Sequence, residues 1–420
     1  MLKINKSIIC IFSIVTCLTT GVSAQSQSNE DNFTMVFMGD PQFYWDCGGG
    51  PDNDEESPVA TNNSDFCKDP ENLKLDGTLQ SKIVNEIQIM SIINEKNRIN
   101  SIKSDSFKGV VINGDLTNTA SSDERKQYDS YYSYVNPWRW FIPVWPGLGN
   151  HDYQNGINRG DNGLPQKYRA YYDYNGDQAA MVQYMGNVIF FLDYYGGINS
   201  NFDIKKWEEN PGQDNDNRNI TGSLSYSWDI GKFHFVQLHN YPGYEVYFKN
   251  GYNSGISSWE INMTSAIVPQ QGNALSWLNQ DLTLAINNKH DKIILNWHKF
   301  DDITTEEKEN IASSLKPFAK HIKAIFVGHL HKYSGKQSNL QLTSNGQTYD
   351  IPVIYSGSPI NSRFVEATFN SKTPISGSSN TKCTIKTQVM NSFSPANIRA
   401  AASFPERLET SPGQYIIDCD

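Results

Sequence analysis

The chain has no excess of positive charge. Its 420 residues include 35 Lys and Arg against 45 Asp and Glu, for a formal net charge of −10 and a sequence pI of about 5.3. Proteins that bind nucleic acid over a broad surface need Lys and Arg to replace the counterions of the phosphates. The composition therefore argues against broad nucleic-acid binding, although bound divalent metals can reverse the sign of the charge within one cleft.

Long apolar runs are also missing. The run from Ile8 to Leu18 is too short to span a bilayer comfortably, and no later stretch approaches the ~20 apolar residues that a membrane helix needs, so we expect no transmembrane segment. Lys3 and Lys6 precede this run, and Val22-Ser23-Ala24 follows it as the small-residue pattern of a cleavage site. We therefore predict a signal peptide over residues 1–24 and a protein that is secreted or periplasmic.

Cysteine is scarce. Four of the six cysteines remain after the predicted cleavage, namely Cys47, Cys67, Cys383 and Cys419. An even number in an oxidising compartment indicates two disulfides, and proximity favours Cys47 with Cys67 and Cys383 with Cys419. A zinc site built from all four is the alternative, and their wide spacing argues against it.

Apolar runs that end on polar residues recur along the chain. Phe33 to Met38 is a predicted strand followed by Gly39-Asp40-Pro41-Gln42, and Val110 to Asn113 is a second one followed by Gly114-Asp115. Apolar residues at helical spacing from Leu79 to Ile99 lie between them. The order of strand, carboxylate, helix, strand and carboxylate favours a βαβ crossover and an α/β sheet.

Three later strands end in the same way. Phe141 to Trp145 leads to Asn150-His151-Asp152, Lys292 to Trp297 leads to His298, and Lys323 to Val327 leads to Gly328-His329-Leu330-His331. The carboxyl ends of strands lie together in an open α/β sheet, so all these polar residues can converge in one crevice. Asp carboxylates, an Asn oxygen and imidazoles suit Zn, Mn or Fe. One Asp between two such groups can bridge a metal pair at roughly 3.5 to 4 Å, the geometry that hydrolyses phosphate esters.

The rest of the chain has weaker signals. The predicted helices are Ser121 to Val135, Ala274 to Ile286 and Thr304 to Phe318; the predicted strands are Val188 to Leu192, a hairpin of Leu224 to Ile230 with Phe233 to Leu238, and Ile351 to Tyr355. We expect Tyr195 to Thr221 to be a polar surface insertion. The aromatic segment Tyr241 to Gln271 either lines a substrate cleft or is a decoration at the domain edge. His239 can reach the cleft from its strand end, although a histidine in a strand is more often structural.

The strand-end residues, taken in order, resemble the motifs of a known superfamily. The set is Gly39-Asp40, Gly114-Asp115, Gly149-Asn150-His151-Asp152, His298 and Gly328-His329-Leu330-His331, and it resembles the calcineurin-like metallophosphoesterases, which include purple acid phosphatases and many phosphodiesterases. The resemblance spans Phe33 to about Ser358. It implies an α/β fold in which two mixed β-sheets pack as a sandwich flanked by helices, in four layers. We accordingly place a catalytic domain at residues 25–365 and a C-terminal extension that closes on it at residues 366–420.

The resemblance also implies a site with two metal ions, of Zn, Mn or Fe. The first metal would be held by Asp40, Asp115 and His331, with Gln42 in the place of a usual histidine. The second would be held by Asp115, Asn150, His298 and His329, so that Asp115 bridges the pair. His151 would stabilise the transition state or protonate the leaving oxygen, and Asp152 would orient His151. The implied function is that of an exported phosphatase, in which a metal-bound hydroxide attacks a small-molecule phosphate ester.

Two residues depart from the patterns of the superfamily. Its first motif is commonly Asp-x-His, whereas this chain has Gln42 at the third position, so the amide oxygen is either a weaker ligand or does not touch the metal. Purple acid phosphatases carry a tyrosine three residues after the second Asp. Asn118 stands there in this chain, so a coloured ferric site is not expected.

Two further functions stay open. One is a phosphodiesterase acting on nucleotides or phospholipid headgroups, because the ligand set does not separate monoesters from diesters. The other is an exported binding protein that has lost activity on the same scaffold, which the substitution at Gln42 suggests. The intact His151 and the remaining ligands argue against such a loss.

Overall fold

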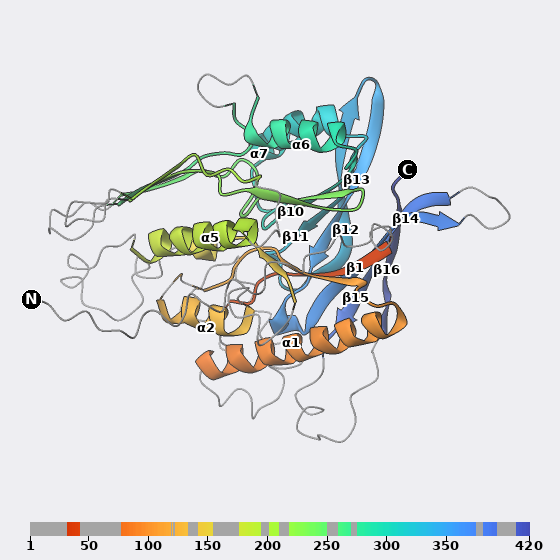
Figure 1. The fold of residues 1–420 in the computed structure, drawn as a ribbon, viewed down its shortest axis with the longest axis horizontal. Coiled ribbons are helices and arrows are strands. Elements are labelled where there is room, and N and C mark those ends of the chain that lie inside the picture. The colour runs from red at the N-terminus through yellow and green to blue at the C-terminus, as the bar shows by residue number, and fades with distance from the viewer. Residues whose placement is uncertain are drawn as a thin grey trace, which may run out of the picture.

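The computed structural model describes most of the chain after residue 31 (Figure 1). The described residues are 32–42, 77–118, 120, 122–132, 142–153, 176–194, 201–209, 218–249, 259–269, 275–374, 381–392 and 409–420. The predicted signal peptide and the predicted pairing of Cys47 with Cys67 lie outside them. All nine predicted site residues lie within them.

The first sheet has six strands in the order β16-β15-β14-β1-β2-β3. The strands are β1 Asn32–Met38, β2 Phe107–Ile112, β3 Val144–Pro146, β14 Arg363–Pro374, β15 Thr381–Asn391 and β16 Glu409–Asp418. β1, β2 and β3 are parallel to one another, whereas β14, β15 and β16 join antiparallel at the other side of β1. The C-terminal strands therefore extend the sheet that carries the first three motifs.

The second sheet also has six strands, in the order β12-β13-β11-β10-β7-β6. The strands are β6 Tyr226–Ile230, β7 Phe233–Gln237, β10 Lys292–Trp297, β11 Ile322–Val327, β12 Ser334–Ser344 and β13 Gln347–Ser356. The four inner strands are parallel, and β6 and β12 are antiparallel edges. The predicted hairpin of β6 and β7 is confirmed.

The second sheet is buried on both faces. On one face Phe326 of β11 stacks on Phe37 of β1, with ring centroids 3.7 Å apart, so side chains of the two sheets contact each other. On the other face Ile325 belongs to a core that also holds Leu282 and Ile311 from two helices. Burial on both faces explains why the parallel strands are continuous apolar runs in the sequence.

Helices lie outside the sheets. They are α1 Gly77–Ile102, α2 Ser122–Tyr132, α5 Gly176–Tyr194, α6 Trp277–Asn287 and α7 Thr305–Leu315, with short 3₁₀ helices η6 His151–Tyr153, η8 Lys316–Phe318 and η9 Pro359–Asn361. α1 lies on the opposite side of the molecule from α6 and α7 (Figure 1). The start of α7 is fixed by a capping box, in which the Thr304 side chain accepts a hydrogen bond from the backbone N–H of Glu307. The predicted α/β class with mixed sheets is confirmed, as are helices α1, α2, α6 and α7.

The predicted strand at Val188 to Leu192 is wrong, because this run lies inside α5. Met181, Met185, Ile189 and Leu192 are all fully buried and recur three or four residues apart, as on one face of a helix. Five apolar residues in a row fit a buried strand and a buried helix equally well. The longer helical spacing, which begins before the run, decides between them.

A third, smaller sheet forms from segments that showed no strand pattern. Its strands, in the order β4-β5-β9-β8, are β4 Lys206–Glu209, β5 Arg218–Gly222, β8 Val246–Lys249 and β9 Trp259–Met263. β4 and most of β5 come from the expected insertion at Tyr195 to Thr221, and β8 and β9 from the aromatic segment. The two segments therefore pair with each other, through the parallel contact of β5 with β9.

The C-terminal tail is held by a disulfide. Cys383 of β15 is bonded to Cys419, which follows β16, as proximity in the sequence predicted. Among the described residues, no helix is both long and apolar enough to cross a membrane.

Candidate metal centre

The loops that follow β1 and β2 lie side by side at one edge of the first sheet. The backbone N–H of Asp40 donates to the carbonyl of Gly114 at 3.0 Å, and that of Gln42 donates to the carbonyl of Asp115 at 3.0 Å. These bonds continue the parallel pairing beyond the strands. They bring the first two motifs together, as their position after neighbouring parallel strands led us to expect.

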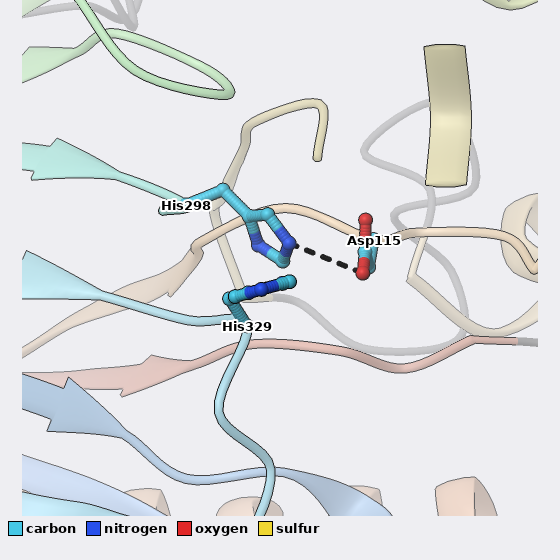
Figure 2. Close-up of side chains that lie close together, drawn as sticks. All are labelled: Asp115, His298 and His329. Atoms are coloured by element: carbon cyan, nitrogen blue, oxygen red, sulfur yellow. Dashed lines mark ion pairs between the residues drawn. The ribbon is translucent and has the colours of Figure 1, made fainter. Parts of the chain in front are cut away.

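His298 connects this edge to the second sheet. It follows β10 directly, and its Nδ1 lies 2.8 Å from the backbone carbonyl of Asn113, while its Nε2 lies 3.1 Å from Oδ2 of Asp115 (Figure 2). A carbonyl oxygen only accepts, so Nδ1 carries the proton of that hydrogen bond. The Nε2 atom is thereby directed at the carboxylate and at the space that His329 also faces.

The loop after β11 contributes two more imidazoles. The backbone N–H of His329 donates to Oδ1 of Asp40 at 3.0 Å, and Nε2 of His331 lies 3.4 Å from the same oxygen. The rings of His298 and His329 meet edge to face, with centroids 5.0 Å apart. Asp40 therefore both fixes the loop backbone and faces one of its side chains.

The described residues contain two groups that can hold a metal ion, and the two groups share Asp115. One consists of Asp115, His298 and His329, and the other of Asp40, Asp115 and His331; within each group the ligand atoms lie within 4.8 Å of one another. Asn150 is adjacent to the first group, since its Oδ1 lies 2.9 Å from Nε2 of His298. Buried carboxylates and imidazoles whose donor atoms lie this close together are the ligands that borderline divalent metals prefer, so these residues fit metal ions.

Gln42 is buried beside the shared carboxylate. Its Nε2 donates to Oδ2 of Asp115 at 3.1 Å. In this orientation the amide nitrogen, which cannot bind a cation, faces the bridging position. The contact fits a residue that holds Asp115 better than one that binds a metal directly.

His151 and Asp152 lie in η6, on the turn after β3. The backbone N–H of His151 donates to Oδ1 of Asp115 at 2.9 Å, and its Nδ1 lies 2.9 Å from the carbonyl of Asn118. The carboxylate of Asp152 makes its hydrogen bonds elsewhere, with the backbone N–H groups of Leu116, Thr117 and Gly149 and the hydroxyl of Thr117, at 2.7 to 3.0 Å. Asp152 thus joins the turn to the loop after β2, and the carbonyl of Asn118 contacts the imidazole of His151.

The backbone is left-handed at three residues of the two metal-binding groups. The φ angles are 57° at Asp40, 51° at Asp115 and 70° at His329. Non-glycine residues adopt such angles rarely and at a cost, and they tend to cluster at functional sites. Three in one small cluster indicate that the loops are shaped to present these side chains.

Two glycines make room for the cluster. A Cβ added at Gly114 would lie 2.4 Å from Nδ1 of His298, and one added at Gly149 would lie 2.2 Å from Oδ1 of Asp115. Neither neighbour can move without displacing a candidate ligand. Packing therefore requires a glycine directly before Asp115 and directly before Asn150.

Burial and charge have opposite effects on the pKa values of Asp115 and His298. Burial alone would raise the pKa of Asp115, but the imidazoles of His298 and His151 hold it well below its usual range. For His298 burial favours the neutral form, and Asp115 outweighs it and raises the pKa of the imidazole to about 9. Each group favours the charged form of the other, so without a metal they form a buried ion pair.

His239 has a structural role, the more common one for a histidine at a strand end. Its Nδ1 accepts from the backbone N–H of Leu148 at 3.0 Å, and its Nε2 lies 2.6 Å from the carbonyl of Leu224. Both ring nitrogens are therefore engaged by backbone groups. The aromatic segment does reach the turn that carries His151, because Tyr244 packs on Tyr153 with ring centroids 4.9 Å apart.

One contact of the cluster was not predicted. Asp302, in the loop between β10 and α7, lies within hydrogen-bond distance of Nε2 of His329. The sequence signal was present, since Asp301-Asp302 follows closely on a strand-end histidine. It was not specific, because carboxylates in polar loops are common.

The chain matches no known protein-family model and no curated protein. The motifs and the geometry of the cluster are therefore the features that point to a function.

Proposed function

We propose that this chain is a metal-dependent phosphoesterase of the calcineurin-like type. The observation that carries the proposal is that two candidate metal-binding groups share the carboxylate of Asp115. A shared carboxylate is the arrangement by which a protein holds two metal ions close enough to act on one phosphate group. The five strand-end motifs supply its members in the order that the superfamily uses.

The fold supports the same proposal. Two mixed six-stranded sheets contact each other through aromatic side chains, and helices pack on the outer face of the second sheet. We interpret this as the four-layer sandwich of the superfamily. The disulfide between Cys383 and Cys419 is compatible with an exported protein.

We assign the ligands as follows. Asp40, Asp115 and His331 would hold one ion, and Asp115, Asn150, His298 and His329 would hold the other. When bound, such ions activate a water molecule as nucleophile and neutralise charge on the phosphate. Gln42 would hold the bridging carboxylate through its hydrogen bond with Asp115.

His151 would act on the leaving group. Because its Nδ1 contacts a carbonyl oxygen, that nitrogen carries a proton, and the second ring nitrogen is left for exchange with a substrate. The side chain is partly exposed, so a substrate oxygen can reach it. In its protonated form, the imidazole would donate a proton to the leaving oxygen as the ester bond breaks. Asp152 would keep His151 in place through the backbone of the turn.

The test combines metal content with hydrolysis. Purified protein is analysed for bound metals, and a panel of phosphate monoesters and diesters is assayed with and without added Mn or Zn. The variants are His151→Ala and, as a matched control, His321→Ala. His321 lies just before the start of β11, at the other end of this strand from His329, and its Nδ1 contacts the carbonyl of Asp291 at 3.2 Å.

We expect close to two metals per chain in all three proteins. We also expect hydrolysis that falls by roughly 10²–10⁴-fold in His151→Ala alone, the usual contribution of a proton donor. The panel decides between a phosphatase, which is our first choice, and a phosphodiesterase. Absence of both metal and activity in the wild type would refute the proposal and favour a binding protein on the same scaffold.

A further inference from the structure

The loop between β10 and α7 places a carboxylate behind one of the candidate ligands. Nε2 of His329 contacts Oδ2 of Asp302, a residue outside both metal-binding groups. A carboxylate only accepts hydrogen bonds when ionised, so Nε2 carries the proton and Nδ1 keeps its lone pair. The contact therefore selects the tautomer of His329 that can bind a metal through Nδ1.

Among the residues that the structure describes, little else near His329 fixes the orientation of its ring. Its backbone N–H is bound to Asp40, which holds the main chain, and the ring touches His298 only edge to face. Rotation by half a turn about the bond to the ring would exchange the positions of the two edges. The contact with Asp302 favours one of these two ring orientations, because it needs a nitrogen at the position that faces the carboxylate.

The loop that carries Asp302 is itself held on both sides. On one side the hydroxyl of Tyr355 donates to the carboxylate of Asp301, and Nζ of Lys308 donates to the carbonyl of Asp301 at 2.9 Å. On the other side Thr304 caps α7. The side chain of Asp302 is 27% exposed, against 7% for that of His329, so the carboxylate lies between the buried cluster and solvent.

We propose that Asp302 is a positioning residue that orients His329 and strengthens it as a metal ligand. Histidines that bind metals generally donate their second N–H to a carboxylate or carbonyl, which fixes the ring and makes the other nitrogen more basic. Asp302 would do this for the ion held by Asp115, His298 and His329. The inference rests on the proposed function, because it supposes that this group binds a metal.

Asp301 offers a matched control, since it is the neighbouring carboxylate of the same loop and contacts Tyr355 instead of a candidate ligand. The experiment titrates metal-free full-length protein with Mn or Zn in a calorimeter, for the wild type and for Asp302→Ala, Asp302→Glu and Asp301→Asn. An Asn at position 301 loses the charge but keeps an oxygen that accepts the hydrogen bond of Tyr355, so the loop stays held. Circular dichroism checks that each variant is folded. Metal affinity is the readout, so the result does not depend on knowing the substrate.

In Asp302→Ala we expect one of two binding events to weaken by roughly 10–100-fold, the usual cost of losing such a partner, while the other is unchanged. Asp302→Glu should recover part of the affinity, and Asp301→Asn should bind as the wild type does. If Asp302→Ala binds both ions with wild-type affinity, or Asp301→Asn weakens binding equally, the inference is wrong although the proposed function stands. If the wild type binds no metal, the proposed function fails as well.

Discussion

His298 and Asp115 come from different sheets and meet at the centre of the candidate site. The Nε2 atom of His298, which follows β10, lies 3.1 Å from Oδ2 of Asp115, which follows β2, and both residues are completely buried. A charged pair removed from water is costly unless further interactions compensate it. A metal ion would take the place of the proton on His298 as the positive partner of Asp115, because only the neutral imidazole can bind a metal.

Replacing Asp115 by Asn should therefore disturb both metal ions, whereas replacing Asp40 should disturb one. Asp115 belongs to both candidate groups and Asp40 to a single group. We expect Asp115→Asn to retain less than one metal per chain and Asp40→Asn to retain about one, measured by elemental analysis after dialysis. Equal loss in the two variants would contradict a bridging role for Asp115.

Gln42 stands in the place of the histidine in the Asp-x-His pattern, and replacing it tests whether it holds Asp115 or binds a metal. Its amide nitrogen donates to Asp115, so Gln42→Met would remove a hydrogen bond while keeping a side chain of similar volume. We expect both metals to remain, with affinity lowered by about 10-fold, as for other lost partners of a ligand. A stoichiometry that falls by one metal would show instead that Gln42 binds an ion directly.

Asp152 should matter for stability and turnover. Its carboxylate accepts four hydrogen bonds, three of them from backbone N–H groups. In Asp152→Asn an amide nitrogen would face one pair of these donors, which costs about 1–3 kcal/mol for each group left without a partner. We expect a matching loss in the free energy of urea unfolding and a lower kcat, because His151 lies on the same turn.

Asp123→Asn is the control for the loss of one carboxylate, since Asp123 is exposed and its ion pair is with Lys126, across one turn of α2. It should unfold within about 0.5 kcal/mol of the wild type, as surface changes usually do. An unfolding free energy of Asp152→Asn equal to that of this control would contradict the proposed role of the carboxylate.

The parts of the site that were predictable from the sequence are those set by single strands. β10 and β11 are buried on both faces, so each is recognisable in the sequence as a continuous apolar run. The polar residues of the site are then identified by their position directly after each run. α5 was misread because the five apolar residues Val188 to Leu192 fit a strand when taken alone, whereas the helical spacing of apolar residues begins earlier, at Met181. The contact of Asp302 with His329 depends on the path of a loop, which neither propensity nor periodicity determines.

A second buried charge cluster lies away from the candidate site, on β6, β7 and α6. Nδ1 of His234 lies 2.7 Å from Asp229, and its Nε2 lies 3.0 Å from Asp281. Since both partners are carboxylates, both ring nitrogens carry protons and the imidazole is positively charged. His290 also faces this cluster, with its Nε2 3.8 Å from Asp229.

This cluster should make the protein less stable at alkaline pH. Burial disfavours the charged imidazole, but Asp281 and Asp229 outweigh it and raise the pKa of His234 from 6.5 to about 9. A pKa raised in the folded state gives stability that is complete below pH 6.5 and is lost as the pH rises through about 9. The loss should be about 3 kcal/mol, since each pKa unit between the folded and unfolded states is worth roughly 1.4 kcal/mol.

The measurement is the free energy of urea unfolding of metal-free protein from pH 6 to pH 10, for the wild type, His234→Gln and the control His321→Gln. The wild type and the control should lose stability together between pH 6.5 and 9, because their His234 gives up its proton in that interval. His234→Gln should be less stable at pH 6, because Asp229 and Asp281 lose the cation between them. It should also change less with pH, because His298 still titrates in that interval but residue 234 does not. Parallel curves for all three proteins would mean that His234 is not charged in the folded state, and the cluster would then be a set of neutral hydrogen bonds.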